Sequence, residues 1–152
     1  MDERERLRDL EARLANARPG HEAELVEDAA RILATETAYR VQRFRDAGAF
    51  ADAAMLVYRA ALPDSGFQFG LGPRLGTRPR RATALIWQRG DACAMPYIAA
   101  TPALALLRAA VTETSSLRDS DLLAACSVCR GLGWYVTADN RKQMCRHGRS
   151  VV

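Results

Sequence analysis

The sequence has little lysine, little histidine and no long apolar run. Only Lys142 among its 22 basic residues is a lysine, and there are two histidines and four cysteines in 152 residues. With so few histidines, a Ser/His/Asp or Cys/His catalytic arrangement has almost nothing to be built from. No apolar run approaches the roughly 20 residues of a membrane-spanning helix. The charged residues 2–6 do not resemble a secretory signal, so we expect a cytoplasmic protein. Because no catalytic arrangement can be proposed, we also expect that the protein is not an enzyme.

What the sequence does have is the composition of an ordinary globular protein. It is 49% hydrophobic and 26% charged, and its length suits one compact domain with a small appendage. Its charge is uneven, because residues 1–62 sum to −2, residues 63–125 to +2 and residues 126–152 to +4. A basic tail of this kind can neutralise phosphates, and it can equally be a solvated surface.

Helical spacing of apolar residues describes the first part of the chain. It predicts three helices, over residues 2–17, 22–47 and 50–62. The second helix places Val41 and Phe44 on its apolar face. Three ion pairs of i,i+4 spacing are expected on the wet faces: Asp9–Arg13, Glu27–Arg31 and Glu36–Arg40.

Alternating apolar residues then predict three short strands, over residues 67–69, 83–87 and 92–99. Pro96 indicates that the last of these is an edge strand or is interrupted. Thr101 as N-cap and Pro102 in the first turn begin a helix that continues to Val111, and the polar residues 115–121 predict a break after it. The sequence therefore predicts an α+β domain over residues 1–120.

A cysteine motif dominates the tail, residues 121–152. Cys126 and Cys129 open the pattern CxxCxGxG, and Cys145 and His147 follow, so that four candidate ligands fall within 22 residues. Two thiolates separated by two residues can converge on one ion from a tight turn, and a glycine after them lets backbone N–H groups point at the sulfurs. A strand over residues 134–136, a turn and a return strand would bring the two pairs together as a hairpin.

Three sulfurs and one imidazole nitrogen make a closed tetrahedral set, the usual form of a structural zinc site. No position would remain for a water molecule, so hydrolytic chemistry at the metal is not expected. A disulfide between Cys126 and Cys129, a redox centre and unmetallated thiols are the alternatives. The fourth ligand also stays open, since a water, Cys93 or His21 could replace His147. Cys93 itself lies in an apolar strand, as a core residue does.

Residues 126–148 resemble a zinc ribbon, and the CxxCxGxG half is similar to the cysteine–glycine repeat of DnaJ-type chaperones. Those chaperones carry four such repeats and a His-Pro-Asp motif, whereas this chain has one repeat, a CxH second pair and no His-Pro-Asp. The resemblance implies metal binding and does not imply a chaperone role.

A second resemblance covers about residues 50–110. The stretches Asp52–Val57, Pro63–Gly72 and Ala100–Leu106 are similar to motifs of a family of small phage and prophage proteins, the phage α/β/α sandwich domain. The resemblance implies a small antiparallel sheet flanked by helices and a phage-type origin, hence the host cytoplasm. It transfers no catalytic residue.

The function that these features predict is that of a non-catalytic zinc-binding accessory protein whose basic zinc ribbon binds a nucleic acid. The residues expected to contact nucleic acid are Arg130, Trp134, Tyr135, Arg141, Lys142, Arg146 and Arg149. The alternative is a protein–protein interaction factor that engages or inhibits a host complex, with the zinc purely structural. No small-molecule substrate is evident. A third hypothesis, an enzyme using the glycine- and arginine-rich loop around Arg78, Arg80 and Arg81, lacks any phosphate-loop pattern, and a surface loop is expected there.

Elemental analysis of the purified protein tests the metal prediction. We expect one zinc per chain in the parent protein and a large loss in the Cys126→Ser variant, because the loss of one thiolate opens a four-ligand site. A parent protein that contains no metal would contradict the prediction.

Overall fold

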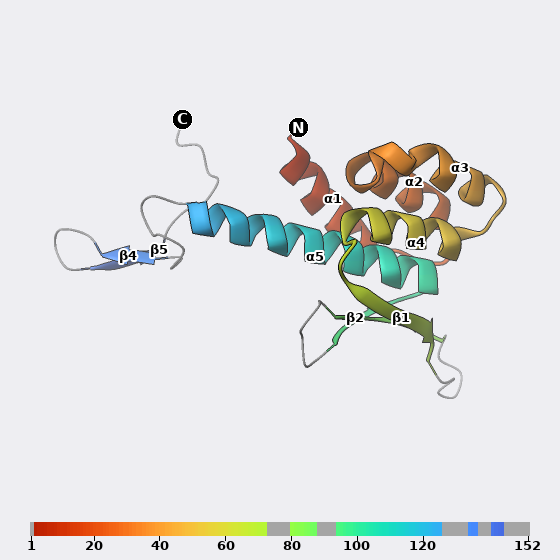
Figure 1. Cartoon of the computed structure of the whole chain (residues 1–152). Coiled ribbons are helices and arrows are strands. Elements are labelled where there is room, and N and C mark those ends of the chain that lie inside the picture. The colour runs from red at the N-terminus through yellow and green to blue at the C-terminus, as the bar shows by residue number, and fades with distance from the viewer. Residues whose placement is uncertain (1, 73–79, 88–93, 126–133, 137–140, 145–152) are drawn as a thin grey trace. The chain divides into compact units, whose positions relative to one another are not determined.

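The structure is a computed structural model, and the residues that it describes are 2–72, 80–87, 94–125, 134–136 and 141–144 (Figure 1). The contacts divide the chain into two compact units, Met1–Thr114 and Ser115–Val152. The first unit combines helices with a small antiparallel sheet, which confirms the predicted α+β class.

The described elements before the tail follow one another in a simple order. They are α1 (Glu3–Ala15), α2 (Glu22–Leu33), the 3₁₀ helix η1 (Thr35–Thr37), α3 (Ala38–Asp46), α4 (Phe50–Ala61), β1 (Gly66–Leu71), β2 (Ala82–Trp87), β3 (Met95–Ala99) and α5 (Pro102–Ala125). The predictions for the first and the third helices are thereby confirmed, with small differences at their ends.

A reciprocal cap starts α1. The backbone N–H of Glu5 donates to the Asp2 carboxylate at 2.8 Å, and the N–H of Asp2 donates to the Glu5 carboxylate at 3.0 Å. The buried face of the helix consists of Leu7, Leu10 and Leu14. On its outer side Arg13 lies 3.7 Å from Asp9, the predicted pair, and 2.8 Å from Asp28 of α2. The hydrogen bond to Asp28 raises the pKa of Arg13.

The prediction of a single helix over residues 22–47 is wrong. The helix ends at Leu33, Ala34 has a non-helical backbone, and η1 separates α2 from α3. Thr35 and Thr37 are the first and last residues of η1. The Thr37 hydroxyl donates to the Ala34 carbonyl oxygen at 3.2 Å, which offers the backbone an alternative to the helix. Alanine carries no signal for a break, which is why the sequence pattern did not show one.

The break also changes which residues meet. The predicted Glu27–Arg31 pair is present, whereas Glu36 lies in η1 and makes no ion pair with Arg40 among the described residues. The expectation that Val41 and Phe44 share the apolar face is half wrong. Val41 is 1% exposed and Phe44 is 39% exposed, because α3 has its own orientation after the break.

The three strands form one antiparallel sheet in the order β1-β2-β3, so that β1 and β3 are its edges. Pro96 lies opposite Leu85 on the edge strand β3, as its missing N–H predicts. β3 begins at Met95, later than predicted, and residues 92–93 lie outside the described residues. β1 extends beyond the predicted strand over residues 67–69, and its Gly70 pairs with Thr83 of β2.

A continuous α5 corrects the prediction of a polar break over residues 115–121. The Thr101 hydroxyl accepts the N–H of Leu104 at 3.4 Å, so the predicted helix start is confirmed, but the helix runs on to Ala125. No glycine or proline interrupts it after Pro102, and the hydroxyls of Thr114 and Ser120 donate to carbonyl oxygens four residues earlier. The predicted domain boundary after residue 120 falls within this helix.

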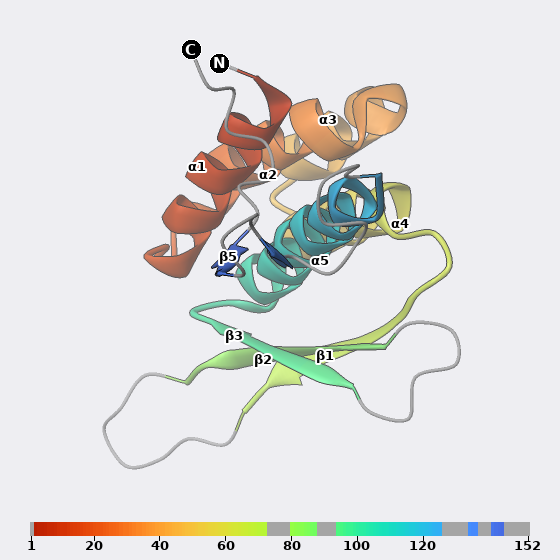
Figure 2. The same cartoon turned by 90° about the vertical axis from the view of Figure 1, so that its left-hand side faces the viewer.

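The core of the first unit surrounds the first half of α5. This segment lies between the sheet on one side and helices α1 and α2 on the other (Figures 1 and 2). Residues Leu104–Leu107 and Ala109–Val111 have no exposed surface. From the sheet, Ala82, Ala84 and Ile86 of β2 are buried against this core. A helix that is apolar on all sides can only be stable when it is buried in this way.

No described helix of the first unit covers the opposite face of the sheet. In the first unit the described helices lie on one side of the sheet (Figure 2). Alternation along the strands assigns to the other side a set of uncharged residues: Gly66, Gln68, Gly70, Thr83, Leu85, Trp87, Pro96 and Ile98. Trp87 is 38% exposed and Ile98 is 46% exposed.

Within the described residues no helix has the length and apolar character needed to cross a membrane.

Gly66 tests the packing of this face. A Cβ atom at this position would lie 2.3 Å from Nε1 of Trp87, whereas a Cβ at Gly70 in the same strand would meet nothing within 4 Å. We therefore expect Gly66→Ala to lower the free energy of unfolding by about 1–3 kcal/mol, as overpacking does, and Gly70→Ala to leave it nearly unchanged. Urea denaturation measures both.

The Trp87→Ala background supplies the control. There the penalty of Gly66→Ala should largely disappear, because the indole that it displaces is gone. An equal penalty in both backgrounds would contradict the contact.

Candidate functional site

The tail contains the hairpin that the sequence predicts. Strands β4 (Trp134–Val136) and β5 (Lys142–Met144) pair antiparallel, with Trp134 opposite Met144 and Val136 opposite Lys142. In such a pair the chain enters the first strand and leaves the second at the same end of the ladder. Trp134 and Met144 are at that end, and the two predicted ligand pairs lie before Trp134 and after Met144 in the sequence.

The predicted metal ligands themselves lie outside the described residues: Cys126, Cys129, Cys145 and His147. The same is true of Cys93, the proposed substitute ligand. Within the described part of the chain, no group of three or more His, Cys, Asp or Glu side chains could hold a metal ion. His21 is exposed, and its Nδ1 accepts the N–H of Arg18 at 3.4 Å. The zinc site therefore remains a prediction.

The predicted nucleic-acid residues divide into two groups. Arg130, Arg146 and Arg149 lie outside the described residues, and Arg141 is exposed. The other three have register positions in the ladder. Because alternate residues of a strand share a face, Trp134 and Lys142 belong to one face of the hairpin and Tyr135 to the other.

A second basic surface, which the sequence did not single out, lies on α3. Tyr39, Arg40, Arg43, Phe44 and Ala47 recur at helical spacing on the side opposite the buried Val41. We call these five residues the α3 face. Four of them, Arg40, Arg43, Phe44 and Ala47, line one hollow of the surface. The spacing was present in the sequence, but the net negative charge of residues 1–62 concealed a local basic cluster.

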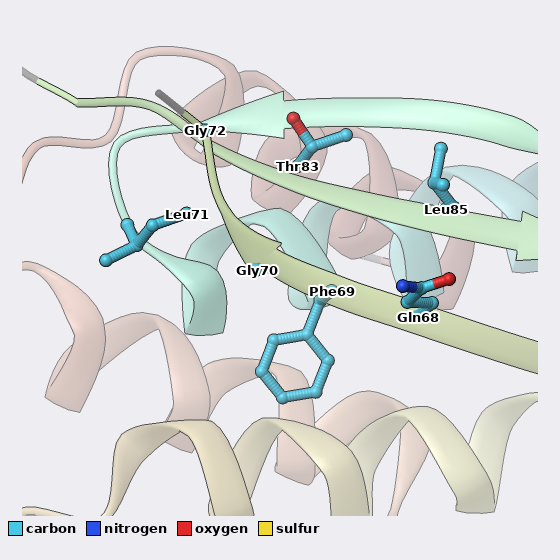
Figure 3. A pocket seen from close by; sticks show the side chains of 7 residues that line it. All are labelled: Gln68, Phe69, Gly70, Leu71, Gly72, Thr83 and Leu85. Carbon is cyan, nitrogen blue, oxygen red and sulfur yellow. The ribbon is translucent and has the colours of Figure 1, made fainter. Parts of the chain in front are cut away.

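A hollow at the end of the sheet is of a different kind. It lies at the β1 edge, where Gly70 and Gly72 lack side chains, and Figure 3 shows Phe69 directed toward the helices while Thr83 and Leu85 point the opposite way. The residues that line it are Gln68, Phe69, Gly70, Leu71, Gly72, Thr83 and Leu85, and none of them is ionisable. Such a hollow can offer apolar contact but neither acid–base chemistry nor metal ligands.

The loop arginines flank this end of the sheet. Arg80 and Arg81 are exposed, and the carbonyl oxygen of Arg81 accepts the N–H of Gly72 at 2.8 Å. Arg78 lies outside the described residues. Arg80 and Arg81 do not line the hollow described above, so the described residues give no support to the hypothesis of an enzyme that uses this loop.

A half-buried pair of titratable groups joins the sheet to α5. The Tyr97 hydroxyl donates to the Glu113 carboxylate at 2.5 Å, and nearby the Thr112 hydroxyl donates to Glu11 of α1 at 2.8 Å. Burial, followed by the bond to Glu113, raises the pKa of Tyr97. The phenol is thus held neutral. The pair connects β3 to α5, and the Thr112–Glu11 hydrogen bond connects α5 to α1, so neither faces a described hollow.

Comparison with known proteins adds no relative. No protein-family model, no curated protein and no solved structure matches this chain.

The raised pKa of Tyr97 predicts a loss of stability in alkali. Stability from this group is fully present below the unfolded pKa of about 10 and is lost as the pH rises above it, because only the unfolded chain then releases the proton. We expect Tyr97→Phe to show a smaller decrease than the parent in the free energy of unfolding between pH ~8 and pH ~11. Urea denaturation at several pH values measures this. Parallel pH profiles for the two proteins would contradict the assignment.

Proposed function

We propose that the chain is a non-catalytic zinc-binding accessory protein, of phage type, whose basic zinc ribbon binds a nucleic acid. The observation that supports the proposal most is the register of the β4–β5 hairpin. Trp134, the first residue of β4, lies opposite Met144, the last residue of β5. In the sequence one ligand pair precedes Trp134 and the other follows Met144, so both pairs are connected to the same end of the ladder. Convergence of two ligand pairs is what a tetrahedral zinc site requires.

The size of the tail supports a metal as its stabiliser. The described strands of the hairpin have three residues each, and a two-stranded hairpin of this length is marginal in water without further support. Small modules commonly gain that support from a structural metal. Zinc would therefore fix the hairpin and with it the arrangement of the basic residues.

The charge of the tail supports an anionic ligand. Residues 126–152 carry five basic groups and one acidic group. Trp134 and Lys142 share one face of the ladder, where an aromatic ring and a cation can contact a base and its phosphate together. We expect Tyr135, on the other face, to contribute less.

Salt dependence tests the proposal. Neutralising about five phosphates predicts a slope near −4 for log affinity against log salt, measured by fluorescence anisotropy with labelled DNA and RNA oligonucleotides. Removal of the metal with a chelator, or Cys126→Ser, should abolish most of the binding. Ser127→Ala, which changes a neighbour of Cys126 that is not a candidate ligand, is the matched control and should bind as the parent does.

Trp134→Ala and Tyr135→Ala separate the faces of the hairpin, and we expect the larger loss from Trp134→Ala. Binding that does not change with salt, or that survives loss of the metal in full, would contradict a role for the ribbon.

A protein partner is the second candidate function, with the zinc purely structural. The sheet face that the described helices leave uncovered favours it, because its eight residues are uncharged and include the exposed apolar side chains of Trp87 and Ile98. A stoichiometric host protein recovered after nuclease treatment, and lost with Trp87→Ala, would favour this function over nucleic-acid binding.

A further inference from the structure

We infer that the α3 face is a second nucleic-acid contact surface, suited to single strands and independent of the zinc. The inference rests on the proposed function only for the class of ligand. Its residues all lie in the first unit, among the described residues, and none belongs to the tail.

The two cations of this face are available to an external anion. The guanidinium groups of Arg40 and Arg43 have no ionic or hydrogen-bonding partner among the described residues. Glu36, one turn earlier, lies in η1 and forms no pair with Arg40. Asp46, at the end of α3, is occupied by Arg45 at 2.7 Å and so leaves Arg43 unneutralised.

The neighbouring arginine shows the contrast. Arg45 is also on α3, but it lies on the side of Val41 and pairs with Glu27 of α2. Its role is to hold two helices together. Within the described parts of the chain Arg40 and Arg43 form no such link, although an arginine on a helix with acidic neighbours commonly does so.

Two aromatic side chains flank the cations. Tyr39 is 73% exposed and Phe44 is 39% exposed, large values for aromatic residues of a folded unit. Exposed aromatic rings next to unpaired arginines provide what an unpaired nucleotide needs, a surface for base stacking and a charge for the phosphate. A duplex hides the faces of its bases, and an acidic peptide has none, so the rings favour a single strand over both.

Paired charge variants test the inference on the whole protein. In anisotropy titrations with labelled oligo(dT), we expect Arg40→Gln with Arg43→Gln to weaken binding about tenfold and to reduce the salt slope by about 1.4, since each phosphate contact contributes about 0.7 on single strands. Arg8→Gln with Arg18→Gln removes the same charge from exposed sites on and after α1 and should change little.

Aromatic variants test stacking separately from charge. Tyr39→Ala should weaken binding about fivefold or more, and Tyr39→Phe, which keeps the ring, should bind as the parent does. Because Tyr39 is exposed, circular dichroism melts of these variants should match the parent, which separates a binding defect from a folding defect.

Three results would overturn the inference. The first is an equal loss of oligo(dT) affinity in the α3 charge variant and in the control charge variant. The second is duplex DNA that binds as tightly as oligo(dT) and loses as much affinity in Tyr39→Ala. The third is polyglutamate that competes as well as unlabelled oligo(dT) does.

The Cys126→Ser background distinguishes this inference from the proposed function. If the α3 variants weaken binding there by the same factor as in the parent, the surface acts independently of the metal. If Cys126→Ser abolishes binding while the α3 variants have no effect, the proposed function is supported and the inference about the α3 face is contradicted. If the α3 variants weaken binding while Cys126→Ser has no effect, the inference is supported and the proposed function is contradicted.

Discussion

Complete burial of the first half of α5 is the constraint on which the first unit depends. Residues Leu104–Leu107 expose no surface, with the sheet on one side and helices α1 and α2 on the other. Because this helix takes one face of the sheet, that face must carry the small and apolar residues of β2, Ala82, Ala84 and Ile86. The Arg108 guanidinium, which donates to the Ile98 carbonyl oxygen at 2.9 Å, adds a polar tie between helix and edge strand.

The surfaces available for function are those that remain exposed after the helices and the sheet of the first unit have packed together. The sheet keeps one uncharged face that no described helix of the first unit covers, since α5 packs on its other face. The α3 face exists because the chain breaks at Ala34, which separates Glu36 from Arg40 and leaves a cation exposed. Surface properties thus derive from the same local events that form the core.

Sequence patterns predicted the elements with strong local signals. The spacing of Leu7, Leu10 and Leu14 identified α1, the Thr101-Pro102 pair identified the start of α5, and Pro96 identified an edge strand. Each of these signals has a direct physical cause in burial, capping or a missing N–H. Hairpin pairing of the tail was likewise predictable, because aromatic and β-branched residues precede the polar sequence of residues 137–140.

Other features could not be predicted, because the signals were weak or tertiary. Ala34 is a good helix former and gives no sign of a break, and serine and threonine fit both a loop and a helix in which their hydroxyls bond backward. The α3 face depends on which arginines find carboxylates, and only packing decides that Arg45 does so while Arg40 does not. For the metal the reverse holds: the spacing of Cys126, Cys129 and Cys145 proposes the site, and those residues lie outside the described ones.

The basic tail is proposed to keep its shape through a bound ion rather than an apolar interior, and zinc K-edge X-ray absorption on the purified protein tests this most directly. We expect a four-coordinate shell with about three sulfur atoms at about 2.3 Å and about one nitrogen at about 2.0–2.1 Å. A shell of oxygen and nitrogen alone, or protein without zinc whose β4–β5 hairpin is nevertheless folded, would contradict the proposal.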